Sequence, residues 1–142
     1  MSSPSHAADT PITVRDQLIQ SLAKGEKPRA DWRIGTEHEK FGFRRADLRP
    51  PPYEPDGIRA VLDAMAGPEW EPILDRGRVI GLKGQGAHRG ASVSLEPAGQ
   101  FELSGGMLQT LHETRDELAA HFEAVRRAAG PLGLGFASML LS

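Results

Sequence analysis

Residues 35–43 read GTEHEKFGF and residues 94–105 read SLEPAGQFELSG, and each segment sets two glutamates among strand-favouring residues. In an extended strand, residues two apart point to the same face and lie roughly 6–7 Å apart, so we expect Glu37 and Glu39 to project side by side. At an effective dielectric of about 20, two like charges about 6 Å apart repel by roughly 3 kcal/mol. A bound cation such as Mg²⁺ would relieve that repulsion. The alternative interpretation is a solvated polar face of an edge strand.

Glu96 and Glu102 are six residues apart, which would place them on one face of a regular strand. Pro97 and Gly99 interrupt that regularity, so the two glutamates could instead lie on adjoining strands of a tight turn. We predict both as ligands for a metal ion or a substrate amine. Gln100 is predicted either to contact substrate or to form hydrogen bonds that satisfy the turn.

His38 stands between two glutamates and is therefore predicted to point to the opposite face of its strand. We expect a packed or hydrogen-bonded structural histidine there. His112 and His121 fall on a predicted long helix and are expected to be interface or surface residues. No His-x-x-x-His pair suggests a zinc site.

The composition is that of one soluble globular domain, with 142 residues, 39% apolar and 25% charged. The net charge of −2 gives no reason to expect nucleic acid as a partner. The absence of cysteine excludes disulfides, thiolate metal sites and a cysteine nucleophile. No secretion signal and no apolar stretch of about 18 residues is visible, so we expect a cytoplasmic protein without membrane contact.

Glycine and proline punctuate the chain into short elements. Residues 1–12 are predicted to be a disordered tail, and 13–142 to form one α+β unit with an antiparallel meander. A helix capped by Asp56 is expected to end at Gly67-Pro68. The other predicted helices are 13–24 and 107–129, and the predicted strands are 32–43, 70–74, 78–83, 91–96, 100–104 and 134–141.

Both acidic segments resemble signature stretches of the glutamate–cysteine ligases of plants and proteobacteria nearly letter for letter. The resemblance continues through Leu48-Arg49-Pro50, 52–54, 56–59 and 107–112, and it spans residues 13 to 136. It covers most of this chain but about the first third of a typical family member. The sequence is therefore similar to an amino-terminal portion of the family's catalytic domain.

The resemblance implies an α+β fold akin to glutamine synthetase, in which an antiparallel sheet with flanking helices forms a carboxylate-lined funnel that this chain builds only in part. It implies Mg²⁺ ions that bridge the phosphates of ATP. By the same resemblance, ATP phosphorylates the side-chain carboxylate of L-glutamate, and the amine of L-cysteine displaces phosphate to give γ-glutamylcysteine, the first step of glutathione biosynthesis. No residue is assigned a catalytic proton transfer. The residues expected at the metal and substrate rim are Glu37, Glu39, Glu96, Glu102 and Gln100.

Two alternatives stay open. One is another carboxylate–amine ligase of the same superfamily with a different acceptor. The other is a non-catalytic fragment or binding module, since the resemblance implies that further metal ligands and most ATP contacts lie beyond residue 142. The same residues would also be present in an inactive truncation of the ligase. The expected partners are L-glutamate, L-cysteine and ATP.

Overall fold

The computed structural model describes residues 11–138, except for the side chain of Ala98. The chain forms two compact units, Met1–Trp32 and Arg33–Ser142. The first contains helix α1, Arg15–Ala23, and a 3-10 turn, Arg29–Asp31. No residue of α1 is buried within its unit. The helix predicted over 13–24 is confirmed, whereas the predicted disorder of 1–12 falls mostly on residues 1–10, outside the described part.

The second unit is built on a six-stranded antiparallel sheet with the order β2-β3-β4-β5-β1-β6. The first four strands of this order, β2 to β5, are a meander in which consecutive strands pair, and β1 and β6 extend the sheet beyond β5. The predicted α+β fold with an antiparallel sheet is therefore confirmed. The strands are β1 Glu37–Arg44, β2 Trp70–Asp75, β3 Arg78–Gly84, β4 Ser92–Glu96, β5 Gln100–Ser104 and β6 Leu134–Ala137.

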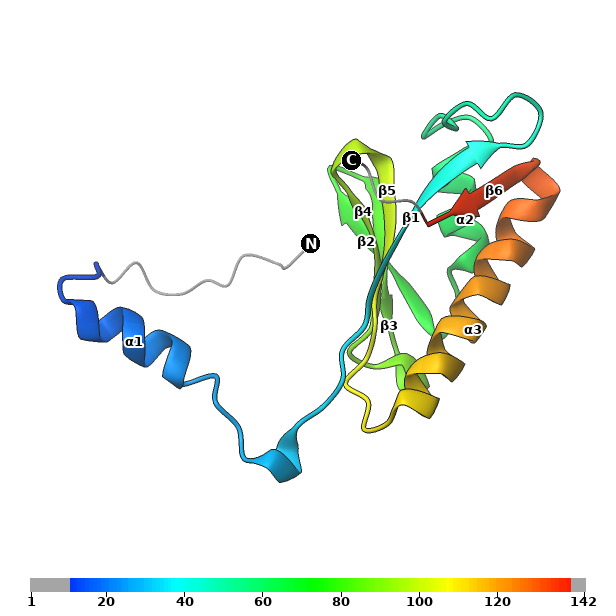
Figure 1. The fold of residues 1–142 in the computed structure, drawn as a ribbon. Coiled ribbons are helices and arrows are strands. Elements are labelled where there is room, and N and C mark those ends of the chain that lie inside the picture. The colour runs from blue at the N-terminus through cyan, green and yellow to red at the C-terminus, as the bar shows by residue number, and fades with distance from the viewer. Residues whose placement is uncertain (1–10, 139–142) are drawn as a thin grey trace. The chain divides into compact units, whose positions relative to one another are not determined.

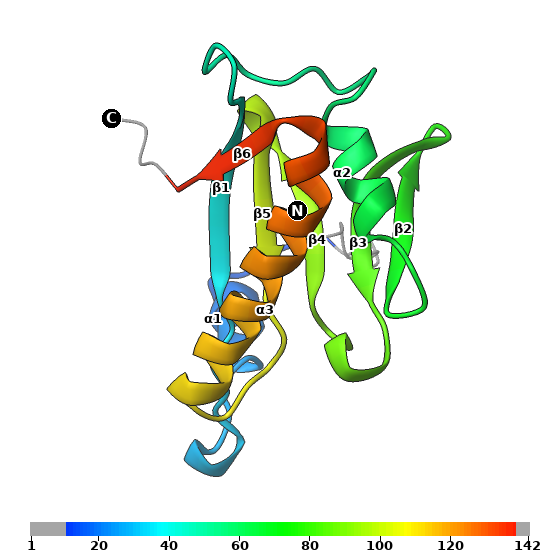
Figure 2. The ribbon, with the colours of Figure 1, turned by 90° about the vertical axis from the view of Figure 1, so that its right-hand side faces the viewer.

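Two helices, α2 (Ile58–Met65) and α3 (Leu111–Ala129), pack together on one face of this sheet (Figures 1 and 2). The sheet contributes Val93, Phe101 and Leu103 to the core beneath them, each at most 1% exposed. Alternation along the strands brings these side chains to the helix-covered face. Removing a large apolar side chain of this kind from water stabilises a fold by roughly 1.5–3 kcal/mol.

Helix α3 begins at a capping box. The Thr110 side chain accepts a hydrogen bond from the Glu113 amide at 3.2 Å, and the Glu113 carboxylate reaches back to the Thr110 amide at 2.9 Å. Hydrogen bonds from the amides of Gln109 and Thr110 and from the Thr110 hydroxyl lower the pKa of the Glu113 carboxyl. The helix therefore starts four residues later than its apolar spacing predicts.

Helix α2 begins after Gly57, and the predicted capping role of Asp56 is wrong because Gly57 occupies the cap position. A Cβ at Gly57 would lie 1.8 Å from the Pro52 carbonyl oxygen, so only glycine fits. That carbonyl accepts the Ile58 amide at 3.0 Å, and the Tyr53 hydroxyl donates to the Val79 carbonyl at 2.8 Å. The proline-rich loop is thereby fixed to both helix and sheet.

The last predicted strand is confirmed over β6, and its residues 139–141 lie outside the described part. Among residues 11–138, no helix is long and apolar enough to cross a membrane. The face of the sheet opposite α2 and α3 carries the glutamates.

Candidate functional site: an acidic sheet face

Strand pairing brings the two acidic segments together. Glu39 on β1 lies directly opposite Glu102 on β5, and Glu37 lies opposite Ser104. His38 and Lys40, on either side of Glu39, lie on the helix-covered face of the sheet. Side chains alternate along a strand, so the glutamates project from the opposite face. We call this surface the acidic face. Its members are Glu37, Glu39, Ser92, Ser94, Glu96, Gln100, Glu102 and Ser104.

The second pair lies on adjoining strands. Glu96 ends β4, a 3-10 turn covers Pro97–Gly99, and Gln100 opens β5 opposite Glu96. Gly99 supplies the positive φ of +78° that the turn uses. Glu96 and Glu102 therefore share a face through the turn rather than through one continuous strand.

Gln100 connects the two segments. Its side-chain amide donates a hydrogen bond to the Glu39 carboxylate across the β1 and β5 pair. Within β5, the Ser104 hydroxyl lies 2.5 Å from Glu102 Oε1. Within β4, the Ser94 hydroxyl lies 3.2 Å from Glu96 Oε1. The donors to Glu39 and Glu102 are uncharged, so these hydrogen bonds leave the negative charge of both carboxylates in place.

The Glu39 and Glu102 pair is electrostatically unfavourable, because like charges directly opposite in an antiparallel pair destabilise it. Glu102 is only 7% exposed, which weakens the screening of its charge by water. Lys40 lies on the other side of the sheet, 2% exposed, and its Nζ donates to the Phe101 carbonyl at 3.2 Å. Burial lowers the pKa of the Lys40 ammonium to about 8, and the attraction of Glu102 opposes that shift.

The donor set of the acidic face suits a hard divalent cation. Mg²⁺ takes hard oxygen ligands, commonly one or two protein carboxylates together with water and phosphate. Glu39 and Glu102 are the facing pair that would hold it, with Glu37 two residues along β1. Within residues 11–138, no three His, Cys, Asp or Glu side chains are gathered into a ready-made metal cluster. Metal binding by these glutamates stays a prediction.

The histidines lie apart from this face. His38 packs edge-on against Phe122 of α3 with ring centroids 4.8 Å apart, and its Nε2 lies 3.2 Å from the Ser138 hydroxyl, so its predicted structural role is confirmed. His112 is exposed, as expected, but His121 is 5% exposed. Sequence reasoning missed the burial of Lys40 and His121, since a charged residue mid-strand and a histidine on a helix are usually exposed.

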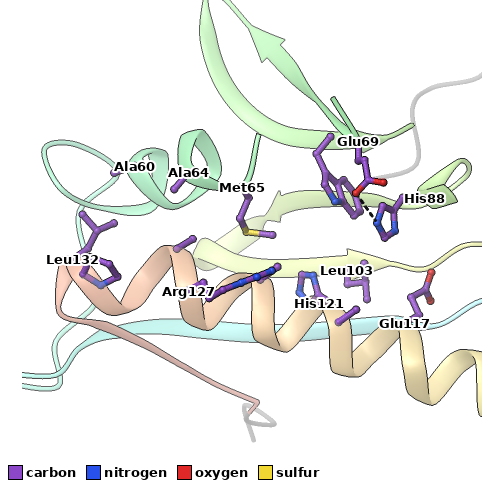
Figure 3. Close-up of a pocket in the computed structure, with 15 residues that line it drawn as sticks. Ala60, Ala64, Met65, Glu69, His88, Leu103, Glu117, His121, Arg127 and Leu132 are labelled. Carbon is purple, nitrogen blue, oxygen red and sulfur yellow. Dashed lines mark ion pairs between the residues drawn. The ribbon is translucent and has the colours of Figure 1, made fainter. Parts of the chain in front are cut away.

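A separate hollow lies on the helix-covered side, between α2, α3 and the turns next to them (Figure 3). None of the predicted site residues lines it. The signal in the sequence was the four-residue spacing of Ala120, Ala124 and Ala128, which marks a stripe of small side chains along α3.

Comparison with known proteins gives consistent matches. The sequence profile described as glutamate-cysteine ligase family 2 matches residues 33–140. The chain is 48% identical over 133 residues to a chloroplastic glutamate–cysteine ligase of Brassica juncea. It is also 48% identical over 127 residues to the chloroplastic glutamate–cysteine ligase A of Oryza sativa subsp. japonica, and over 130 residues to the chloroplastic enzyme of Arabidopsis thaliana.

These alignments cover 93%, 89% and 91% of this chain but 24% of each relative. The chain thus spans about a quarter of the length of the relatives that it matches. The expectation of a cytoplasmic protein is wrong, because these relatives are named as chloroplastic enzymes.

Proposed function

The chain belongs to glutamate–cysteine ligase family 2, and from that premise we propose that its acidic face forms part of the site at which ATP drives the ligation of L-glutamate to L-cysteine. The γ-carboxylate of glutamate takes the terminal phosphoryl group of ATP, and ADP leaves. The cysteine amine then attacks the acyl carbon, phosphate leaves, and the amide bond of γ-glutamylcysteine forms.

This proposal rests on the position of Glu39 directly opposite Glu102. Two carboxylates held opposite each other in an antiparallel pair are a costly arrangement for folding alone. The same arrangement favours a site for a divalent cation that accompanies a nucleotide. Mg²⁺, when bound there, would offset charge on the phosphate oxygens.

The chain's own contribution is positioning. Both carboxylates stand on adjacent strands of one sheet, and Gln100 connects the strands by donating to Glu39. Rigid strands place charged groups more reproducibly than loops do. Glu37, Glu39, Glu96 and Glu102 act as ligands and do not transfer protons, while Gln100 orients Glu39 or the substrate.

The proposal is tested by calorimetric titration of Mg²⁺·ATP into the 142-residue chain and its variants Glu39→Gln and Glu71→Gln. Glu71 is the matched control because it lies on β2 opposite Lys83 rather than opposite another carboxylate, and like Glu39 it accepts a hydrogen bond from a glutamine, Gln85, at 2.8 Å. We expect binding that Glu39→Gln weakens about tenfold or more and that Glu71→Gln leaves within about twofold. Equal affinity in all three proteins would contradict the proposed role of the acidic face.

The acceptor is tested separately by ADP release with ATP, Mg²⁺ and L-glutamate, with and without L-cysteine. Turnover that depends on both amino acids supports the ligase. Turnover that accepts another amine equally well supports a different carboxylate–amine ligase.

A further inference from the structure

The hollow beside α3 has the size of a ligand site. Its volume is about 580 Å³, within the usual range for small-molecule pockets. Its floor includes Leu103, which points away from the acidic face, so the two sites lie on opposite sides of the sheet. We call this hollow the alanine groove (Figure 3). Its alanines are Ala60, Ala64, Ala120, Ala124 and Ala128.

Most of the side chains that line the alanine groove are apolar. The methyl groups of these alanines on the facing helices leave room that larger side chains would fill. At one end, the rings of Trp70 and His88 stack with centroids 4.9 Å apart and an angle of 25°. Such walls suit a flat apolar body, because aromatic rings favour offset stacking and apolar burial.

A second and independent observation comes from His121, which points from α3 toward the strand that carries Leu103 (Figure 3). Its side chain is only 5% exposed, and neither ring nitrogen has a hydrogen-bond partner in the described structure. Burial lowers the pKa of His121 to about 3, so the ring is neutral and carries one donor and one acceptor. A buried polar group without a partner is costly, and a ligand polar group would satisfy it.

The charged side chains of the groove are of both signs and lie apart. Glu69 and Glu117 lie toward the end that carries His88, whereas Arg127 lies nearer Leu132, so an anionic group fits only at the Arg127 end (Figure 3). The Glu117 carboxylate accepts the Gly106 amide at 2.8 Å through Oε1, while its buried Oε2 has no hydrogen-bond partner among the described residues, and Glu69 lies 3.7 Å from His88 Nε2. Arg127 lies along the groove, and within residues 11–138 no acidic side chain forms an ion pair with it (Figure 3). A guanidinium presents a planar fork that matches a carboxylate.

We propose that the alanine groove binds a small aromatic carboxylate, with its flat body between the two helices, its anionic head on Arg127 and a polar edge toward His121. This site is additional to the acidic face and does not depend on the ligase reaction.

The test uses 2-naphthoate as the probe, titrated into the full chain and followed by amide NMR shifts and calorimetry. We expect one saturable site whose shifts lie in α2 and α3. Arg127→Gln should weaken binding about tenfold or more, while the matched variant Arg115→Gln, whose arginine pairs with Asp116 at 2.7 Å outside the groove, should change it less than about twofold. Ala124→Phe should block the groove.

The neutral analogue naphthalene-2-carboxamide provides a second readout. We expect it to bind wild type about tenfold more weakly than 2-naphthoate and to bind Arg127→Gln as well as it binds wild type. The proposal is overturned if naphthoate leaves the α2 and α3 signals unmoved. It is also overturned if Arg127→Gln and Arg115→Gln have the same effect. The comparison of the two arginine variants tests the proposal even if Ala124→Phe does not fold.

Discussion

Replacing Glu39 by glutamine should stabilise the metal-free chain. Glu39 and Glu102 are directly opposite, so their side chains start about 5 Å apart. Coulomb's law gives a repulsion between roughly 1 kcal/mol in a water-like dielectric and roughly 3 kcal/mol at an effective dielectric of about 20. Because Glu39 is exposed, we take the lower value. In Glu39→Gln, the carbonyl oxygen of the new side chain would still accept the hydrogen bond from Gln100.

The assay is urea unfolding at pH 7 in EDTA, followed by circular dichroism. Glu39→Gln should raise the free energy of unfolding by about 1 kcal/mol, or the melting temperature by about 4 °C. Glu102→Gln should gain less, because it also removes the attraction between Glu102 and the buried Lys40 ammonium. Both changes remove the same repulsion, so the double variant should gain no more than either single variant. Glu71→Gln should give no gain, because Glu71 faces Lys83.

Two results would refute this reasoning. Additive gains in the double variant would show that the two carboxylates do not interact. A loss of stability in Glu39→Gln would show that the hydrogen bond from Gln100 outweighs the repulsion. Either result removes the electrostatic argument for a cation at this pair.

Three further predictions concern the scaffold. His121 has a pKa of about 3 in the folded chain against 6.5 when unfolded, so the unfolded state takes up its proton first and stability falls as the pH drops from about 6.5 toward 3. His121→Leu should remove this part of the acid sensitivity, measured as unfolding free energy against pH, and an unchanged profile would contradict it. Thr110→Ala should cost about 1 kcal/mol in urea unfolding by removing the acceptor for the Glu113 amide. Tyr53→Phe should cost about 1 kcal/mol in the same assay, because the Val79 carbonyl loses its donor.

Local pattern was enough to predict most elements. The run 100–104 alternates and is bounded by glycines, and it forms β5 over the predicted residues. Helix α3 was predicted from its apolar spacing but placed four residues early. The sequence Thr110-x-x-Glu113 carried the correct start as a capping box.

The geometry of the site could be established only from the structure. Glu39 and Glu102 are far apart in sequence, and their facing depends on strand register, which long-range pairing sets. The start of α2 at Gly57 depends on the nearby Pro52 carbonyl, which spacing cannot reveal. Lys40 is buried because its side chain lies on the helix-covered face of β1, with Nζ 5.5 Å from the centre of the Phe101 ring, and the local sequence gives no sign of that position.

The most direct test of the central claim is to locate the metal. Mn²⁺ with ATP, added in small amounts to the ¹⁵N-labelled chain, broadens amide signals near its site. We predict selective broadening along Glu37–Arg44 and Gln100–Ser104, lost in Glu39→Gln and kept in Glu71→Gln. Broadening centred on α3, or broadening of β1 and β5 that survives Glu39→Gln, would contradict a metal and nucleotide site on the acidic face.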